Sequence, residues 1–155
     1  MGLYYSLLVS DLDGTLLTSD NQISKHTRQA IDRYQKNGGM FTIATGRSLR
    51  ASLDIINELH IGLPVILYNG AMLYYPYENE IREVVPKGIS KGNALQYLNQ
   101  ILQIPARKTA AIGNQLNDIS MLRIAGLSAS VANAHPLVKQ YTDVIVPTND
   151  QEGVR

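Results

Sequence analysis

The chain alternates between short runs of β-forming residues and longer amphipathic stretches, and this alternation limits the folds available to it. Strand side chains point to opposite faces in turn, whereas apolar residues three and four positions apart line one face of a helix. The predicted strands cover residues 7–10, 40–44, 64–68, 109–112, 127–131 and 143–146. Helices are predicted between them, after the favourable N-cap residues Ser24, Ser48 and Ser90, over about 115–124, and after Pro136.

Strands that alternate with helices imply right-handed crossovers and a mostly parallel sheet covered on both faces. We therefore expect an α/β fold with a Rossmann-like, doubly wound, mostly parallel sheet. A chain of 155 residues suits one domain, and we expect a single core domain over 1–155. One segment departs from the alternation. Residues 71–75 and 80–85 flank a PYEN turn, which predicts a β-hairpin over about 71–86.

The composition is that of an ordinary globular protein, with 45% hydrophobic and 17% charged residues. The net charge is +1 and the basic residues are dispersed, so we expect neither nucleic acid nor a membrane surface as a partner. The chain has no cysteine, which excludes disulfides, thiolate metal sites and a cysteine nucleophile and fits a cytoplasmic location. No apolar run approaches the ~20 residues of a membrane span.

Polar residues follow almost every predicted strand. In a sheet of this kind, ligands bind beyond the carboxyl ends of the strands. The polar and glycine residues at those positions are Asp11, Asp13, Thr45, Gly46, Arg47, Asn69, Asn114, Asn117, Asp118 and Asn133. We therefore expect them to gather at one edge of the sheet.

Asp11 and Asp13 stand two positions apart at the end of the first strand, before Gly14. Strand alternation would send both carboxylates to one side, where they would repel each other unless one took up a proton or a cation lay between them. Carboxylate and carbonyl oxygens suit Mg²⁺. A solvated acidic turn is the alternative interpretation of this stretch taken alone.

Seven short motifs occur in order along the chain: DLDGTLL, ATGRS, NGA, GISKGNAL, GNQLNDISML, VANAHPLVK and EGV. In this order they resemble the haloacid dehalogenase (HAD) superfamily of phosphatases, and within it the Cof-type hydrolases. The resemblance covers almost the whole chain. It implies a HAD-type core and a magnesium-dependent phosphomonoester hydrolase that acts on a phosphorylated substrate through an aspartyl-phosphate intermediate.

The resemblance also implies roles for individual residues. Asp11 would be the nucleophile, and Asp13 the general acid that protonates the leaving oxygen and then activates water. Thr45 and Lys91 would complete the catalytic set by binding a phosphoryl oxygen and neutralising charge. The implied phosphate-binding residues are Thr45, Gly46, Arg47, Asn69, Lys91, Asn117 and Asn133, and the implied Mg²⁺ ligands are Asp11, Asp13, Asn114 and Asp118. Taken singly, Arg47, Asn69 and Asn133 are also explicable as strand-end or turn residues.

The sequence departs from the family pattern at Asn114. The fourth motif is usually GDxxND, and this chain has Asn114 in place of the first acid. An amide oxygen can still ligate Mg²⁺, but the site loses one negative charge, which should weaken metal binding. The second interpretation of the chain is therefore a weakly active or inactive HAD-like module that serves in binding or assembly.

The segment between the NGA and SKG motifs is the second departure. Cof-type hydrolases carry a cap domain there, but this chain has only the short stretch from Met72 to Ile89. Three alternatives follow: a large substrate covers the site, subunits of a homo-oligomer cover it for one another, or the enzyme is poor and promiscuous. The hairpin tyrosines, Tyr74, Tyr75 and Tyr77, are predicted to be an interface or substrate platform, or to pad the sheet edge.

Three other functional classes do not fit the pattern. The chain has no nucleophile-elbow motif, which argues against Ser-His-Asp hydrolysis. DLDG rather than a glycine-rich turn follows the first strand, which argues against dinucleotide binding. A receiver domain would place its phosphorylated aspartate after the third strand, where this chain has Tyr68 and Asn69.

Overall fold

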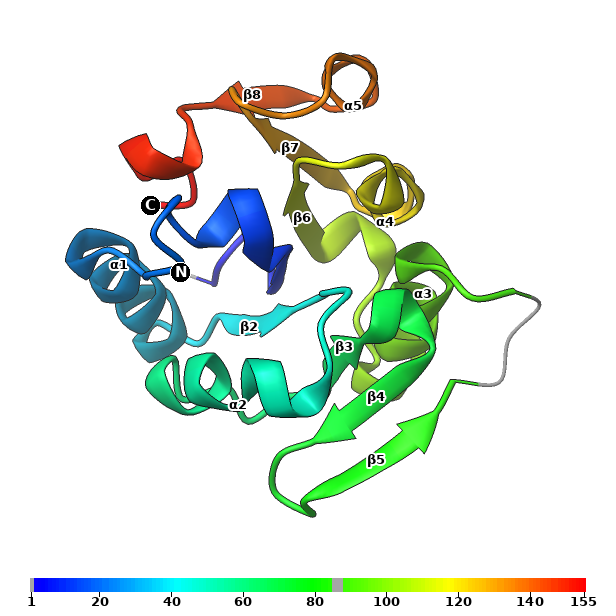
Figure 1. The fold of residues 1–155 in the computed structure, drawn as a ribbon. Helices are drawn as coiled ribbons and strands as arrows, with labels where there is room; N and C mark the ends of the chain where they lie inside the picture. The colour runs from blue at the N-terminus through cyan, green and yellow to red at the C-terminus, as the bar shows by residue number, and fades with distance from the viewer. Residues whose placement is uncertain (1, 85–87) are drawn as a thin grey trace.

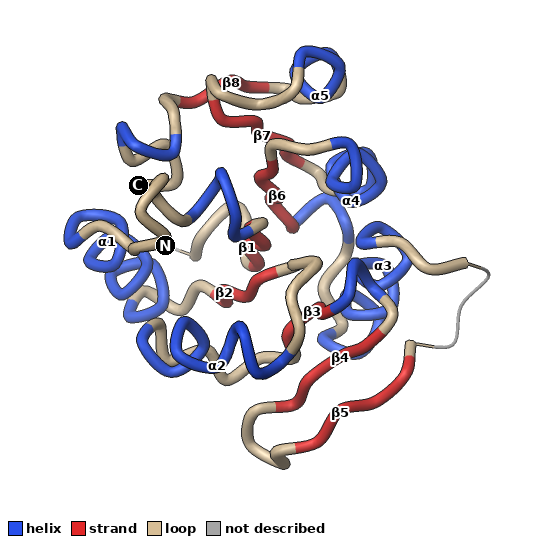
Figure 2. Tube along the Cα trace, in the orientation of Figure 1, coloured by secondary structure: helices blue, strands red, loops and turns tan. Residues whose placement is uncertain are grey.

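The computed structural model describes residues 2–84 and 88–155. The strands are β1 (Leu7–Ser10), β2 (Met40–Ile43), β3 (Val65–Leu67), β4 (Met72–Tyr75), β5 (Glu80–Glu83), β6 (Thr109–Gly113), β7 (Leu127–Val131) and β8 (Val144–Val146). The α-helices are α1 (Lys25–Lys36), α2 (Leu49–Glu58), α3 (Lys91–Leu102), α4 (Ile119–Ile124) and α5 (Pro136–Gln140) (Figures 1 and 2). The end of the predicted hairpin, residues 85–86, lies outside the described residues.

Five strands form a parallel sheet in the order β2-β1-β6-β7-β8. Leu7 of β1 is in register with Met40 of β2 on one side and with Thr109 of β6 on the other. Strand β3 pairs with β4, and β4 with β5, in a smaller antiparallel sheet. The two sheets meet at a single parallel bridge between Ala44 and Ile66. The predicted mostly parallel sheet with an added hairpin is therefore confirmed.

Helices cover both faces of the parallel sheet (Figure 1). Leu7 and Val9 of β1 belong to a buried cluster with residues of α3, α4 and α5. Phe41 and Ile43 of β2 belong to a second cluster with residues of α1 and α2. The doubly wound arrangement follows from this distribution of apolar side chains. In the described part of the chain, no helix combines the length and apolarity needed to cross a membrane.

Serine side chains fix the starts of the three longest helices, as predicted. The hydroxyl oxygen of Ser24 accepts from the Thr27 N–H at 3.1 Å, and that of Ser48 accepts from the Ala51 N–H at 3.2 Å. Ser90 accepts from the Asn93 N–H at 3.0 Å. Each bond satisfies a backbone donor that has no partner within the first helical turn. The cap at Ser90 makes Lys91 the first residue of α3.

Candidate active site

Two carboxylates from separate strand ends meet at one buried ammonium group. Lys91 Nζ donates to Asp11 Oδ1 at 2.8 Å and to Asp118 Oδ1 at 2.7 Å. Asp11 directly follows β1, and Asp118 ends a short 3-10 helix between β6 and α4. The Lys91 and Asp118 side chains are fully buried, and that of Asp11 is 9% exposed. This cluster of Asp11, Lys91 and Asp118 forms the charged centre of the candidate site.

The charges in this cluster shift the pKa values of Asp11 and Lys91. Burial, together with repulsion from Asp118, raises the pKa of Asp11 from 3.8 to about 6, against the opposing attraction of Lys91. Burial alone would lower the pKa of Lys91, but the attraction of the two carboxylates outweighs it and raises the pKa. Lys91 is therefore held as a cation, while Asp11 takes up a proton more readily than an ordinary aspartate.

The loop after β6 holds Asp118 in place. Its Oδ2 accepts from the backbone N–H groups of Asn114 at 2.9 Å and Gln115 at 3.0 Å. Both carboxylate oxygens of Asp118 are therefore engaged, one by Lys91 and one by the loop backbone. Gly113 permits this arrangement, because a Cβ there would lie 2.6 Å from the Asp118 carboxylate. The clustering of polar residues after β6 thus serves to position Asp118.

Asp13 does not join this cluster. Its carboxylate accepts from Arg47 Nε at 3.0 Å, and a second guanidinium nitrogen of Arg47 completes a bidentate pair. The pair raises the pKa of Arg47. The expectation that Asp11 and Asp13 crowd each other was wrong, since the acid that repels Asp11 is Asp118.

Asp11 and Asp13 depart from the expected arrangement because β1 ends at Ser10, before both residues. A wide helical turn covers Leu12–Leu16, interrupted by extended backbone at Asp13 (φ −67°, ψ 123°) and by Gly14 at φ 74°. The two-residue alternation of a strand therefore does not extend from Asp11 to Asp13.

Thr15 links Asp11 to Asn114 and was not among the predicted site residues. Its hydroxyl lies 3.3 Å from Asp11 Oδ2 and 3.1 Å from Asn114 Oδ1. Two acceptor oxygens thus converge on one hydroxyl, although 99 residues separate Thr15 from Asn114. The threonine belongs to the DLDGT stretch, so the sequence contained it but gave no indication of its partners.

The side chains around Asp11 supply oxygen atoms that suit Mg²⁺. Asp11 Oδ2 and Asn114 Oδ1 form an oxygen pair of the type that Mg²⁺ prefers. Asp118 stands next to them, with its oxygens already engaged. Among the described residues there is no group of three or more histidine, cysteine, aspartate or glutamate side chains that could hold a metal ion. The Asp11 and Asn114 oxygens are therefore donors of a type that suits Mg²⁺, while the Asp13 carboxylate pairs with Arg47 in the structure and Asp13 stays a predicted ligand.

The remaining predicted residues flank the charged cluster. Thr45 is fully buried, and its hydroxyl oxygen accepts from the Arg47 N–H at 3.0 Å. Asn117 Nδ2 donates to Asn69 Oδ1 at 2.8 Å, and Gly46 lies against the Asn69 side chain. These contacts bring the loops after β2, β3 and β6 together at one edge of the sheet, as predicted.

An open cavity of about 580 Å³ lies on the side of the site toward β7 and the C-terminal turn. Asp13, Asn114 and Asn133 are among its predominantly polar lining residues. Asn133 Nδ2 donates to the Gly14 carbonyl oxygen at 2.9 Å, which fixes the turn that carries Asp13. Asn133 therefore supports the backbone of the site in the structure.

The chain is similar in sequence to known phosphatases. It is 35% identical over 108 residues to a phosphoglycolate phosphatase of Archaeoglobus fulgidus, a match that covers 68% of this chain and 45% of that protein. It is 23% identical to a 5-amino-6-(5-phospho-D-ribitylamino)uracil phosphatase of Bacillus subtilis, over 229 aligned positions that cover 96% and 92% of the two chains. The chain thus spans less than half the length of the first of these relatives.

A solved structure shows the same fold. The haloacid dehalogenase-like hydrolase from Bacteroides thetaiotaomicron aligns with a TM-score of 0.89 and 22% identity, over 97% of each chain. The sequence profile of the haloacid dehalogenase-like hydrolases matches residues 8–83 and 73–155, so its two matched segments overlap in the β4–β5 hairpin. These matches extend over nearly all of the chain. Together with the arrangement of its strand-end residues, they show that the chain belongs to the haloacid dehalogenase-like hydrolase family.

Proposed function

We propose that this chain is a magnesium-dependent phosphomonoester hydrolase that works through an aspartyl-phosphate on Asp11. The observation that carries the proposal is the buried Asp11 carboxylate, held at the carboxyl edge of the sheet by Lys91 Nζ at 2.8 Å. The phosphatases among its relatives support the same reaction class.

The two carboxylate oxygens of Asp11 have different hydrogen-bond partners. Oδ1 accepts from Lys91 at 2.8 Å, whereas Oδ2 lies 3.3 Å from the Thr15 hydroxyl. In the first step an Asp11 oxygen attacks phosphorus, and a P–O bond to the carboxylate forms as the bond to the leaving oxygen breaks. In the second step water attacks phosphorus, which restores Asp11 and releases inorganic phosphate.

Lys91 and Thr45 are placed to stabilise the negative charge of the phosphoryl group. Lys91 stays cationic between two carboxylates, so it keeps Asp11 oriented and offsets negative charge near the reacting atoms. The Thr45 hydroxyl oxygen accepts from Arg47, and its proton can then be donated to a phosphoryl oxygen. Gly46, Arg47, Asn69, Asn117 and Asn133 surround these groups and are proposed to position the phosphate.

Asp13 is proposed as the general acid and base. It donates a proton to the leaving oxygen in the first step and removes one from the attacking water in the second, so the proton balance closes over one turnover. In the structure Asp13 pairs with Arg47, which must share its guanidinium with the arriving phosphate or release Asp13. The exposed position of Asp13 gives it access to a leaving group from solvent.

Mg²⁺ would be held by Asp11 and Asn114, with Asp118 next to them. When bound, it would offset charge on the phosphoryl oxygens. Because Asn114 is neutral, the protein contributes few charges to the metal.

The hairpin takes the place of a cap in this proposal. The family profile matches in two segments that overlap at residues 73–83, which supports a core whose halves are joined through β4 and β5. The site would then open to solvent at the carboxyl edge of the sheet. A homo-oligomer that covers this opening is one proposed arrangement, and a large substrate is another.

The alternative function is a weakly active or inactive binding module. Asn114 favours it, because a neutral amide stands beside Asp11 and both oxygens of Asp118 are already occupied. Turnover in the presence of Mg²⁺ separates the two functions.

The test is phosphate release from p-nitrophenyl phosphate with Mg²⁺. The wild-type chain should turn over, and Asp11→Asn should abolish release, because an amide is a far poorer nucleophile. Asp54→Asn, an exposed aspartate on α2, is the matched control and should retain wild-type rates. Equal rates for wild type and Asp11→Asn would overturn the proposal.

A further inference from the structure

Two consecutive residues at the edge of the site have left-handed backbone. Tyr68 has φ 50° and Asn69 has φ 55°, directly before Gly70 at φ 101°. Asparagine tolerates this conformation, but a bulky residue such as tyrosine adopts it rarely and at a cost in strain. Such strain persists only where the surrounding structure imposes it, and it concentrates at functional sites.

Residues of the proposed phosphate site impose this conformation from one side. The Tyr68 N–H donates to the Arg47 carbonyl oxygen at 3.2 Å, and the Asn69 N–H donates to the Thr45 carbonyl oxygen at 3.0 Å. The Asn69 side chain also accepts from Asn117. The backbone of Tyr68 is thus bonded to the residue whose guanidinium holds Asp13.

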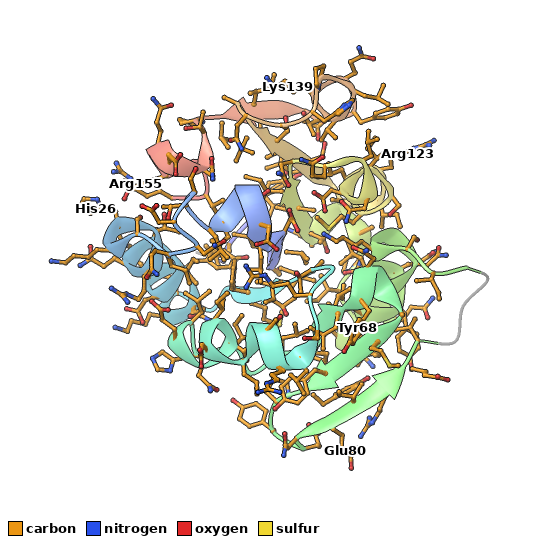
Figure 3. All side chains as sticks on the ribbon, viewed as in Figure 1. His26, Tyr68, Glu80, Arg123, Lys139 and Arg155 are labelled. Carbon is orange, nitrogen blue, oxygen red and sulfur yellow. The ribbon has the colours of Figure 1, made fainter. Side chains whose placement is uncertain are left out.

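The start of α3 imposes the left-handed conformation from the other side. A Cβ on Gly70 would lie 2.1 Å from the Ser90 carbonyl oxygen, so the turn packs directly on the residue before Lys91. Tyr68 therefore stands between the Thr45–Arg47 loop and the helix start that carries Lys91. Tyr68 is 44% exposed, and Figure 3 shows it near the hairpin.

We propose that Tyr68 is a specificity-determining residue whose ring contacts the leaving group of the substrate and favours planar or ring-bearing leaving groups. This inference rests on the proposed phosphatase function and names the substrate class for that site. Glycine at this position would avoid the strain, yet the chain has a half-exposed tyrosine here, whose backbone is bonded to the loop that carries Thr45 and Arg47. Because one half-exposed ring buries far less area than a stable protein interface needs, a small-molecule contact fits it better than a docked protein.

The kinetic test compares phenyl phosphate with glycerol 2-phosphate, whose leaving group has no ring. Tyr68→Ala should lower kcat/KM for phenyl phosphate by about threefold to tenfold, mainly through KM, the range expected for an aromatic contact. The value for glycerol 2-phosphate should change little. Tyr68→Phe should keep the wild-type preference. Tyr97→Ala is the matched control, since Tyr97 is also 44% exposed but lies in helix α3.

A second comparison tests the strain. Tyr68→Gly and Tyr68→Ala both remove the ring, but only alanine keeps a Cβ in the left-handed conformation. Tyr68→Gly should therefore unfold at a higher urea concentration than Tyr68→Ala and show the same loss of preference for phenyl phosphate. A purely structural role for Tyr68 predicts instead that both substrates lose activity in proportion to the loss of stability.

Binding to the Asp11→Asn variant separates failure of the inference from failure of the proposed function. Calorimetry should show tighter binding of phenyl phosphate than of glycerol 2-phosphate, and the difference should vanish when Tyr68→Ala is added. If wild type turns over both substrates but Tyr68→Ala keeps the preference, the inference fails and the phosphatase function stands. If wild type releases no phosphate, the function fails and the binding comparison still decides the role of Tyr68. If neither compound binds, the inference is overturned.

Discussion

Lys91 Nζ lies 2.8 Å from Asp11 Oδ1, although 80 residues separate the two positions in the chain. The same ammonium contacts Asp118 at 2.7 Å, so one buried cation balances two buried carboxylates. Removing one member of such a cluster leaves an uncompensated buried charge, which costs more than an exposed ion pair would. The stability of the site and its proposed chemistry therefore depend on the same three side chains.

Replacing Lys91 with methionine should destabilise the chain by about 3–5 kcal/mol at neutral pH. Without the ammonium, the pKa of Asp11 rises further in the folded state, so the folded chain binds a proton more tightly than the unfolded chain. The stability of Lys91→Met should consequently fall as pH increases. Urea unfolding at about pH 5 and about pH 8 checks this, and an equal loss at both values would contradict it.

The raised pKa of Asp11 predicts a pH dependence of stability in the wild type. Its pKa is 3.8 in its ordinary state and about 6 in the fold, so the folded chain retains a proton that the unfolded chain releases. Stability should fall as pH rises from about 4 to about 7, by up to about 3 kcal/mol from this group. Asp11→Asn should lose this dependence when unfolding is followed in EDTA. The exposed control Asp54→Asn should keep it, and parallel curves for wild type and Asp11→Asn would count against the assignment.

Asn114→Asp should strengthen Mg²⁺ binding by about tenfold or more, because it adds a full charge beside Asp11. In EDTA the same variant should be less stable than wild type, since a third acid then joins Asp11 and Asp118. Calorimetric titration with Mg²⁺ and urea unfolding measure the two effects. A gain in turnover along with affinity would indicate that the natural site is impaired. Unchanged affinity would show that Asn114 is not at the metal.

Gly70→Ala should destabilise the chain by about 2–4 kcal/mol, because it adds both left-handed strain and a clash with backbone. The added Cβ would lie 2.1 Å from the Ser90 carbonyl oxygen. Gly38→Ala is a matched control, since Gly38 also has positive φ but nothing within 4 Å, and it should cost only about 1 kcal/mol. Phosphate release should fall in Gly70→Ala alone, because only that clash displaces the residue before Lys91. Similar losses in both variants would contradict this packing.

Local signals in the sequence predicted the fold well. The serines at 24, 48 and 90 each cap the helix expected after them, because capping depends on neighbours within one turn. The alternation of apolar residues located each strand to within about two residues. The attachment of β3 through the single bridge between Ala44 and Ile66 was not predicted, since strand pairing depends on contacts that the pattern of one segment does not specify.

The partners of the site residues were harder to predict. The residues after each strand were identified because parallel strands end at one edge, yet Asp13 pairs with Arg47, and Thr15 joins Asp11 to Asn114. Both outcomes depend on where the chain leaves β1, and the turn at Asp13 and Gly14 is set by tertiary contacts such as the Asn133 bond to the Gly14 carbonyl oxygen. Sequence position therefore predicted which residues gather at this edge, except Thr15, but not which of them touch.

The most direct test of the central claim is to trap the phosphorylated chain. Acid quenching during turnover of a phosphoryl-labelled aryl phosphate, followed by digestion and mass spectrometry, should find the label on the peptide that carries Asp11. The label should be absent from Asp11→Asn and present in the exposed control Asp54→Asn. A wild-type chain that releases phosphate without labelling Asp11, or that carries the label on another residue, would contradict the account.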